Sequence, residues 1–305
     1  MDTNRKSLAA RVLYSPGIAP YVFVLPFLLA FSLFFVYPII STILMSFQQV
    51  LGLHNNVFIG LKNYSRLIDI HFWNAIKTST LYAFFTIVVL IPLPVIFSVF
   101  LSARSMPARN LFRSVLFIPA LTSAIAAGVA FRLFFGETPV WPANQVLALF
   151  GLKPVKWTLG YSSGIFIMVT LASWRWLGVN VVYFLSGLQN VPPELYESAD
   201  IDGAGPLAKF FRITLPLLRP IIVYVLTISI YGGYAMFAES YVYWPEGMPG
   251  DTGLSMVRYI YQQAFGRNDL GLGSAIGIAL LVIVFTINLV QLRFFGLFRR
   301  ERGDR

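Results

Sequence analysis

The chain has 305 residues, of which 57% are hydrophobic and only 12% are charged, a composition far from that of a soluble domain. It contains no cysteine, which excludes disulfides, thiolate metal sites and a cysteine nucleophile. Because a formal net charge of +10 also occurs in nucleic-acid-binding proteins, the positions of the basic residues must distinguish that class from a membrane protein.

Apolar runs long enough to cross a bilayer follow one another along almost the whole chain. A helix needs roughly 20 apolar residues to span the hydrocarbon core. The first run is too long for a signal peptide and lacks a small-residue cleavage site, so we expect a retained helix. The sequence therefore predicts an all-α polytopic membrane protein with six transmembrane helices in one domain, residues 1–305. The predicted spans are 21–47, 75–101, 114–135, 165–188, 220–238 and 275–298.

Lysine and arginine are distributed unevenly between the connections. They gather in the N-terminal segment 1–20, in the second and fourth connections and in the tail 299–305. By the positive-inside bias, these segments and both termini are predicted to be cytoplasmic. The basic excess is thus a topology signal, and no nucleic-acid partner is expected. The outer loops are then 52–72, 137–161 and 241–270.

The polar, acidic segment 190–219 connects the fourth and fifth predicted spans. Pro192 and Pro193 favour a helix start, and Gly203 favours its end. Pro206 permits a second helical start, so we expect two short helices with a break between them. Helices that lie on a bilayer are usually rich in lysine on their polar face, whereas this segment is acidic. Docking onto another protein is therefore favoured over a membrane-surface helix.

Catalytic and metal-binding patterns are missing from the sequence. It has no Gly-Lys pair and hence no Walker A loop to hold ATP phosphates. His54 and His71 lack the spacing of a zinc site. The segment 160–164 matches a nucleophile-elbow pattern, but it precedes a predicted span and has no histidine nearby in sequence, so it is interpreted as a turn. We predict no catalytic residue, no metal site and no enzymatic activity.

Polar and aromatic residues of the fourth and fifth spans are candidates for lining a substrate path. Arg175 lies near the middle of its span, where exposure to lipid is costly, and a structural role and a path-lining role both stay open. Glu239 ends the fifth span at a different apparent depth, so a direct pair with Arg175 is not expected. Aromatic rings could face such a path, although packing between helices is the alternative for each ring. The other candidates are Trp176, Asn180, Tyr183, Tyr231 and Tyr234.

The segment Glu197-Ser-Ala-Asp-Ile-Asp-Gly203, followed by Ile213-Thr-Leu-Pro216, closely resembles the EAA loop of the membrane-spanning subunits of bacterial ABC importers. That family's pattern is Glu-Ala-Ala, three residues, Gly, nine residues and Ile-x-Leu-Pro. Segments 176–192, 237–252 and 259–265 are similar to the carbohydrate branch, which contains the larger membrane subunit of maltose importers. The residues in register are Glu197, Ala199, Gly203, Ile213, Leu215 and Pro216, with Ser198 replacing the first Ala.

The resemblance implies the type I ABC importer permease fold and ATP-driven uptake of a sugar or oligosaccharide across the bacterial plasma (inner) membrane. It also implies a second homologous permease subunit, two ATPase subunits, an extracytoplasmic substrate-binding protein and surrounding membrane lipid as partners. ATP and Mg would be used by the ATPase subunits, with no cofactor bound to this chain. The implied ATPase-coupling residues are Glu197, Ala199, Asp202, Gly203, Ile213, Leu215 and Pro216.

Two alternatives stay open. An importer of a sugar phosphate such as glycerol phosphate is motivated by Arg175. An ion-coupled secondary transporter is less well supported, because it would need buried acids at mid-membrane, and Glu239 is the only acid near a predicted span.

Overall fold

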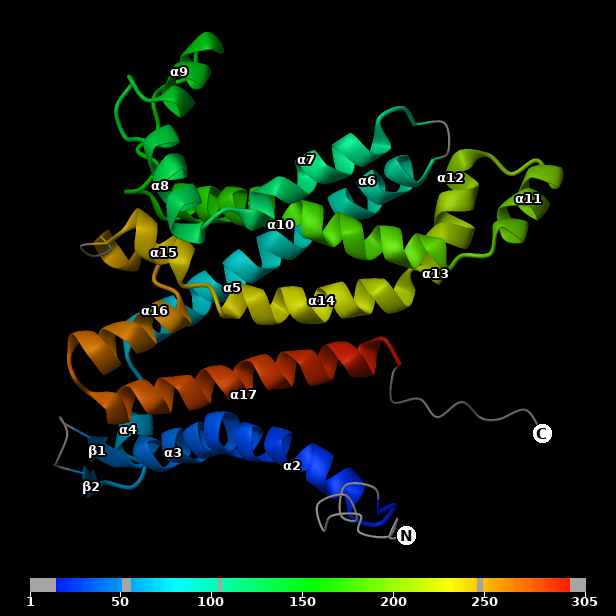
Figure 1. The fold of residues 1–305 in the computed structure, drawn as a ribbon. Helices are drawn as coiled ribbons and strands as arrows, with labels where there is room; N and C mark the ends of the chain where they lie inside the picture. Colours follow the sequence, from blue (N-terminus) through cyan, green and yellow to red (C-terminus); the bar gives the residue numbers. More distant parts are fainter. Residues whose placement is uncertain (1–14, 51–55, 104–105, 246–248, 297–305) are drawn as a thin grey trace, which may run out of the picture. The chain divides into compact units, whose positions relative to one another are not determined.

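The computed structural model describes residues 15–50, 56–103, 106–245 and 249–296 (Figure 1). The predicted tail 299–305 and most of the segment 1–20 lie outside these residues. The chain forms two compact units, Met1–Arg66 with Gln263–Ile278, and Leu67–Gln262 with Ala279–Arg305. The prediction of a single domain stays a prediction.

The first unit begins with a continuous helix over Ala19–Ser46, made of α2 (Ala19–Phe31), the π-helical η1 (Ser32–Val36) and α3 (Tyr37–Ser46). Buried Asn63 holds the turn that follows, because its Nδ2 donates to the carbonyls of Ser46 at 3.0 Å and Gln48 at 2.8 Å. Arg66 and Asp269 form an ion pair at 2.8 Å. The remaining elements are β1 (Gln48–Val50), antiparallel to β2 (Asn56–Phe58), α4 (Lys62–Ser65), η4 (Gln262–Gly266) and the start of α17 (Leu270–Phe294).

The second unit is built around α10 (Tyr161–Gln189), a 29-residue helix that packs against α5, α6, α7 and α14 (Figure 1). It also contains the rest of α17. Its other elements are α5 (Ile70–Leu90), α6 (Pro92–Ser102), α7 (Arg109–Leu121), α8 (Ala124–Phe134), α9 (Pro142–Leu149), α11 (Pro193–Ile201), α12 (Pro206–Lys209), η2 (Phe210–Thr214), α13 (Leu215–Leu217), α14 (Arg219–Tyr234), α15 (Ala238–Tyr243), η3 (Pro249–Asp251) and α16 (Met256–Tyr261).

Within the described residues, five helical segments are long and apolar enough to cross a membrane, or up to six if one bent pair counts as a span. The bent pair is α7 and α8, which replace the predicted third span 114–135 and meet at 96°. The bend falls where Thr122 and Ser123 adopt extended backbone. The count of six and the side of the termini stay predictions. The five segments are Ala19–Ser46, Ile70–Ser102, Tyr161–Gln189, Arg219–Tyr243 and Leu270–Phe294.

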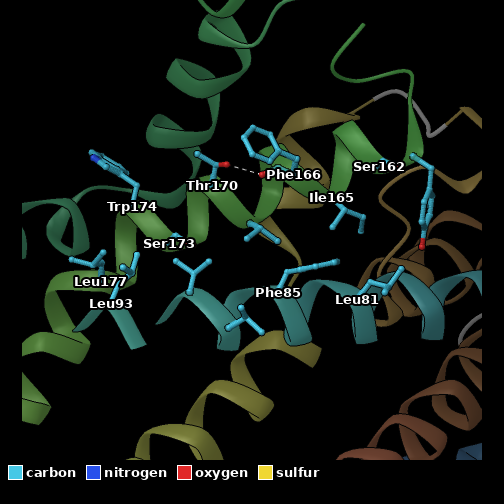
Figure 2. Close-up of a pocket in the computed structure, with 14 residues that line it drawn as sticks. Leu81, Phe85, Leu93, Ser162, Ile165, Phe166, Thr170, Ser173, Trp174 and Leu177 are labelled. Atoms are coloured by element: carbon cyan, nitrogen blue, oxygen red, sulfur yellow. Dashed lines mark hydrogen bonds between the residues drawn. The ribbon is translucent and has the colours of Figure 1, made fainter. Parts of the chain in front are cut away.

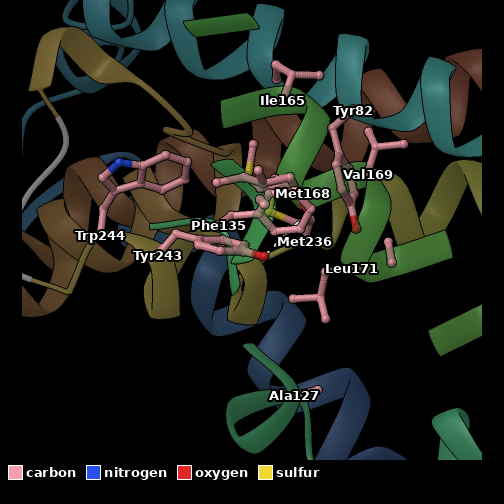
Figure 3. Close-up of a cluster of buried hydrophobic side chains, with 13 residues drawn as sticks. Tyr82, Ala127, Phe135, Ile165, Met168, Val169, Leu171, Met236, Tyr243 and Trp244 are labelled. Carbon is pink, nitrogen blue, oxygen red and sulfur yellow. Dashed lines mark hydrogen bonds between the residues drawn. The ribbon is translucent and has the colours of Figure 1, made fainter. Parts of the chain in front are cut away.

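A cluster of large apolar side chains forms the main core of the second unit (Figure 3). The inward face of α10 supplies Met168, which has no exposed surface, and Leu171. Phe135 follows α8, while Tyr243 and Trp244 come from the end of α15. This packing holds α10 against the segments that follow α8 and α14.

Gly178 lets α10 and α7 approach backbone to backbone. A Cβ at this position would lie 1.9 Å from the carbonyl oxygen of Leu116 and 2.4 Å from its carbonyl carbon. Neither atom can move as a flexible side chain would, so any larger residue must push the two helices apart.

We expect Gly178→Ala to lower the stability of the folded chain, because overpacking against a backbone costs about 1–3 kcal/mol or more. Gly232→Ala in α14 is the matched control, since a Cβ there meets nothing within 4 Å. The control should be neutral or up to about 1 kcal/mol more stable, from helix propensity. Thermal unfolding of the purified full-length chain in detergent measures both. Equal effects in the two variants would contradict the close approach.

Candidate functional site

A cavity of about 550 Å³ lies among α5, α10, α14 and the residues that follow α14. It contains all but one of the predicted path residues, although they come from two distant parts of the sequence. On α10, Trp176, Asn180 and Tyr183 follow one another at intervals of about one turn, which places them along one helix face. The predicted residues that line the cavity are Arg175, Trp176, Asn180, Tyr183, Tyr231 and Glu239.

Tyr234 does not line this cavity. Its side chain is 4% exposed and packs in a cluster with Ala83 and Ile230. Its hydroxyl shares a hydrogen bond of 2.8 Å with Thr80 Oγ1. These contacts give Tyr234 a role in packing α14 against α5.

Arg175 and Glu239 form a buried ion pair beside the cavity, with 3.8 Å between Nη1 and Oε1 and side chains 12% and 9% exposed. The expectation that their depths differ too much for a pair is wrong. It assumed a continuous fifth helix, whereas α14 ends at Tyr234 and Phe237 has non-helical backbone with φ of −134°. The new helix α15 therefore starts in a different direction and presents Glu239 to α10. The guanidinium of Arg175 also lies 5.4 Å from the Trp176 ring.

Several cavity residues were missed in the sequence. Tyr82 and Thr86 lie one turn apart on α5, and the break after α14 contributes Met236 and Phe237. The spacing of Tyr82 and Thr86, one turn apart in a predicted span, was an available signal. The backbone break that exposes residues 235–237 had no such signal.

Aromatic rings continue from the cavity toward the segment that follows α15. Phe237 stacks on Tyr241 with ring centroids 5.3 Å apart, and Tyr261 lies 5.3 Å from Phe237. The guanidinium of Arg258 lies 4.4 Å from the centre of the Tyr241 ring, and its Nη2 donates to the carbonyl of Trp244. Burial lowers the pKa of Arg258, while both tyrosines oppose this shift. Of these rings, Phe237 lines the cavity, and Tyr241 and Tyr261 pack behind it.

A second cavity of about 640 Å³ lies between α5 and α10 (Figure 2). Its lining is mostly aliphatic and aromatic, with Phe85, Phe166 and Trp174 among the larger side chains. The hydroxyl of Thr170 is not available as a donor to a ligand, because it donates to the carbonyl of Phe166 at 2.7 Å (Figure 2). The lining of the 550 Å³ cavity includes Arg175, Asn180 and Glu239, so that cavity is the better candidate for a polar ligand.

Asn180 also supplies a hydrogen-bond donor at the break between α5 and α6. Pro94 has no N–H, so the carbonyl of Leu90 loses the donor that a continuous helix would provide. The Nδ2 of Asn180 donates to this carbonyl at 2.9 Å in a buried position. The break falls at the two prolines Pro92 and Pro94, since α5 ends at Leu90 and α6 starts at Pro92.

The segment 190–219 folds into short helices separated by a break, as predicted. Gly203 ends α11 with φ of +74°. Its N–H donates to the carbonyl of Asp200 at 3.1 Å, and the N–H of Ala204 donates to that of Ala199 at 2.8 Å. This pair of bonds is a Schellman motif, for which a positive φ at the glycine is required. The next helix, α12, begins at Pro206.

Side-chain contacts hold the two halves of this loop together. Tyr196 and Thr214 share a hydrogen bond of 2.9 Å, and Lys209 forms an ion pair with Asp200. The loop lies beyond the ends of α10 and α14 (Figure 1). It is thus a small folded unit that projects from the helices.

The predicted coupling residues lie on the surface of this loop. Glu197, Asp202, Gly203 and Pro216 are exposed, while Ala199, Ile213 and Leu215 are partly buried. Large apolar side chains beside them were missed in the sequence. These side chains, with their exposed fractions, are Ile201 (88%), Leu207 (75%) and Phe211 (60%).

Replacing Asn180 with leucine should destabilise the chain by about 1–3 kcal/mol, because the buried Leu90 carbonyl is left without a donor. Adding Pro94→Ala should recover much of this loss, since alanine at that position supplies the helical N–H. Thermal unfolding of wild type, both single variants and the double variant measures the coupling between the two sites. Additive effects would contradict the assigned role of the Asn180 amide.

No family model matches the chain. It is 51% identical over 288 residues to the arabinooligosaccharides transport system permease protein AraP of Bacillus subtilis, across 94% of this chain and 92% of that protein. It is 47% identical over 304 residues to the protein of the same name from Halalkalibacterium halodurans, across 100% and 95%. The fold matches a bacterial ABC transporter involved in the import of the acidic polysaccharide alginate, with a TM-score of 0.80, 22% identity and coverage of 92% and 96%. The chain therefore belongs to the permease subunits of ABC importers, in the branch that transports carbohydrates.

Proposed function

We propose that this permease carries a neutral oligosaccharide, with an arabinose-containing oligosaccharide as the first candidate. Both AraP relatives are named for arabinooligosaccharide transport. The 550 Å³ cavity supports this proposal, because Trp176, Tyr183 and Tyr231 offer ring faces for stacking. We assign this cavity to the translocation pathway, of which the chain forms half.

The observation that carries the choice of a neutral cargo is the Arg175–Glu239 pair. The negative charge of a phosphorylated substrate calls for an arginine that has no acidic partner in the protein. Here Glu239 lies 3.8 Å from Arg175 and balances its charge, which disfavours the sugar-phosphate alternative. Glu239 is the only acid among the described residues that line the cavity, and it too is paired. Ion-coupled transport is therefore also disfavoured.

The partners belong to the same proposal. We infer a second homologous permease subunit, two ATPase subunits that use ATP and Mg, and an extracytoplasmic substrate-binding protein. The surface of the segment 190–219 supports ATPase docking, because exposed acids lie beside Ile201, Leu207 and Phe211. Six spans with both termini in the cytoplasm of a bacterial plasma membrane complete the proposed arrangement. On this arrangement the chain transports without hydrolysing ATP itself.

The Arg175–Glu239 pair gives a test of the cargo. Arg175→Gln and Glu239→Gln should each lower the amount of assembled transporter, because an unpaired buried charge costs about 3–5 kcal/mol. The double variant carries no uncompensated charge, so it should assemble better than either single variant and still take up the neutral oligosaccharide. Size-exclusion yield, together with uptake of radiolabelled arabino-oligosaccharide and glycerol phosphate, measures this. Normal assembly of Arg175→Gln with transport lost only for the anionic sugar would favour the sugar-phosphate alternative.

A further prediction tests the coupling of the segment 190–219 to the ATPase subunits. Gly203→Val should reduce ATPase stimulation and uptake, because a β-branched residue at positive φ costs about 1–3 kcal/mol and distorts the end of α11. Gly205→Val is the matched control, since Gly205 has φ of −69° and a Cβ at either position meets nothing within 4 Å. Glu197→Lys should also abolish uptake without affecting membrane insertion, by reversing a charge at the docking surface.

Proteoliposomes that contain the partner subunits and the binding protein provide the measurement. Wild-type ATPase stimulation in both Gly203→Val and Glu197→Lys would remove this loop from the mechanism.

A further inference from the structure

A third cavity, of about 640 Å³, lies beside the segment 190–219, which we call the coupling loop. The ends of α6 and α10, the start of α7, and α11, α12 and η2 surround it. We call it the basic cavity, because Arg109, Arg113 and Lys209 line it and none of the described residues in its lining is acidic. Since α6 ends at Ser102 and α10 at Gln189, the cavity lies where these helices reach the predicted cytoplasmic surface of the membrane.

The charges of this cavity are only partly compensated. Lys209 is paired with Asp200, which does not line the cavity. Arg113 Nη2 donates to the carbonyl of Leu101 at 3.0 Å, while its Nε is buried without a hydrogen-bond partner in the described part of the chain. Arg109 is exposed in the first turn of the 13-residue helix α7, where the helix dipole adds positive potential. The cavity therefore favours an anion.

The lining also includes apolar side chains, which favour one kind of anion over another. Val99 on α6 and Leu185 and Leu188 on α10 line the cavity together with Phe210. A free phosphate would gain nothing from these side chains, whereas a phospholipid presents both a phosphodiester and hydrocarbon. Basic pockets between helices on the cytoplasmic side of a membrane are suited to anionic headgroups.

We propose that the basic cavity binds the phosphodiester headgroup of an anionic phospholipid, with Arg109 and Arg113 as its main contacts. Tyr196, Lys209 and Thr214 of the coupling loop line the same cavity. A bound lipid would thus contact the loop from the side of α6 and α10 and fix its position against the membrane surface. This assignment holds for any cargo of the cavity described above.

Native mass spectrometry of the full-length chain, purified in detergent and exposed to equal amounts of phosphatidylglycerol and phosphatidylcholine, tests the site. Wild type should retain phosphatidylglycerol in preference. Arg109→Gln should lower that preference about fivefold, and Arg113→Gln at least as much. Arg293→Gln is the matched control, because Arg293 is exposed near the end of α17 and does not line the cavity, so its preference should equal that of wild type.

Arg113 also donates to the carbonyl of Leu101 at the end of α6, so Arg113→Gln could fail to fold. In that case the result for Arg109→Gln alone tests the proposal. Equal retention of the two lipids by wild type would overturn the proposal, as would equal preferences in Arg109→Gln and Arg293→Gln. Millimolar inorganic phosphate provides a further arm. Displacement of phosphatidylglycerol by phosphate would assign the cavity to a soluble anion and overturn the lipid assignment. Retention of the lipid in phosphate supports the proposal.

Discussion

A backbone carbonyl inside a membrane has no water to bind, and this constraint decides where the helices of this permease can break. At three breaks in the second unit, a polar side chain donates to a backbone carbonyl beside the break. Asn180 donates to the carbonyl of Leu90 at the break between α5 and α6. The hydroxyl of Thr122 donates to the carbonyl of Pro119 at the bend between α7 and α8, at 2.6 Å. After α14, buried Ser255 donates to the carbonyl of Met236 at 2.7 Å.

The break after α14 generates the polar cavity. Because the chain leaves helical geometry between α14 and α15, residues 235–237 line the cavity and Glu239 reaches Arg175. Without this pairing each charge would be buried uncompensated, at a cost that exceeds most single stabilising contacts. Together the break and the ion pair give a cavity with polar groups and rings but no uncompensated charge, which suits a neutral sugar.

Sequence patterns predicted the features that depend on local physics. Five apolar runs overlap the five helical segments that can span a membrane, and the prolines and Gly203 mark the ends of helices in the structure. Most of the predicted path residues meet in one cavity because α10 is a single helix with a regular repeat. The 96° bend between α7 and α8 and the Arg175–Glu239 pair were missed. Both lie at breaks where a side chain donates to a backbone carbonyl, and hydropathy does not register such bonds.

The coupling loop is connected to the cavity by one unbroken helix, α10, on one side and by several short helical segments before α14 on the other. On one side, α10 runs without a break from Arg175 to Gln189, and α11 begins at Pro193. Since a helix rises about 1.5 Å per residue, the cavity and the loop are roughly 20 Å apart along α10.

On the other side, α12 continues through the π-helical η2 and the short α13 before α14 starts at Arg219. Such segments often mark places where a helix can deform. If the ATPase displaces the loop, the unbroken α10 links that displacement to Trp176, Asn180 and Tyr183. Because Asn180 also holds the Leu90 carbonyl, movement of α10 acts on the break between α5 and α6 as well as on the lining of the cavity.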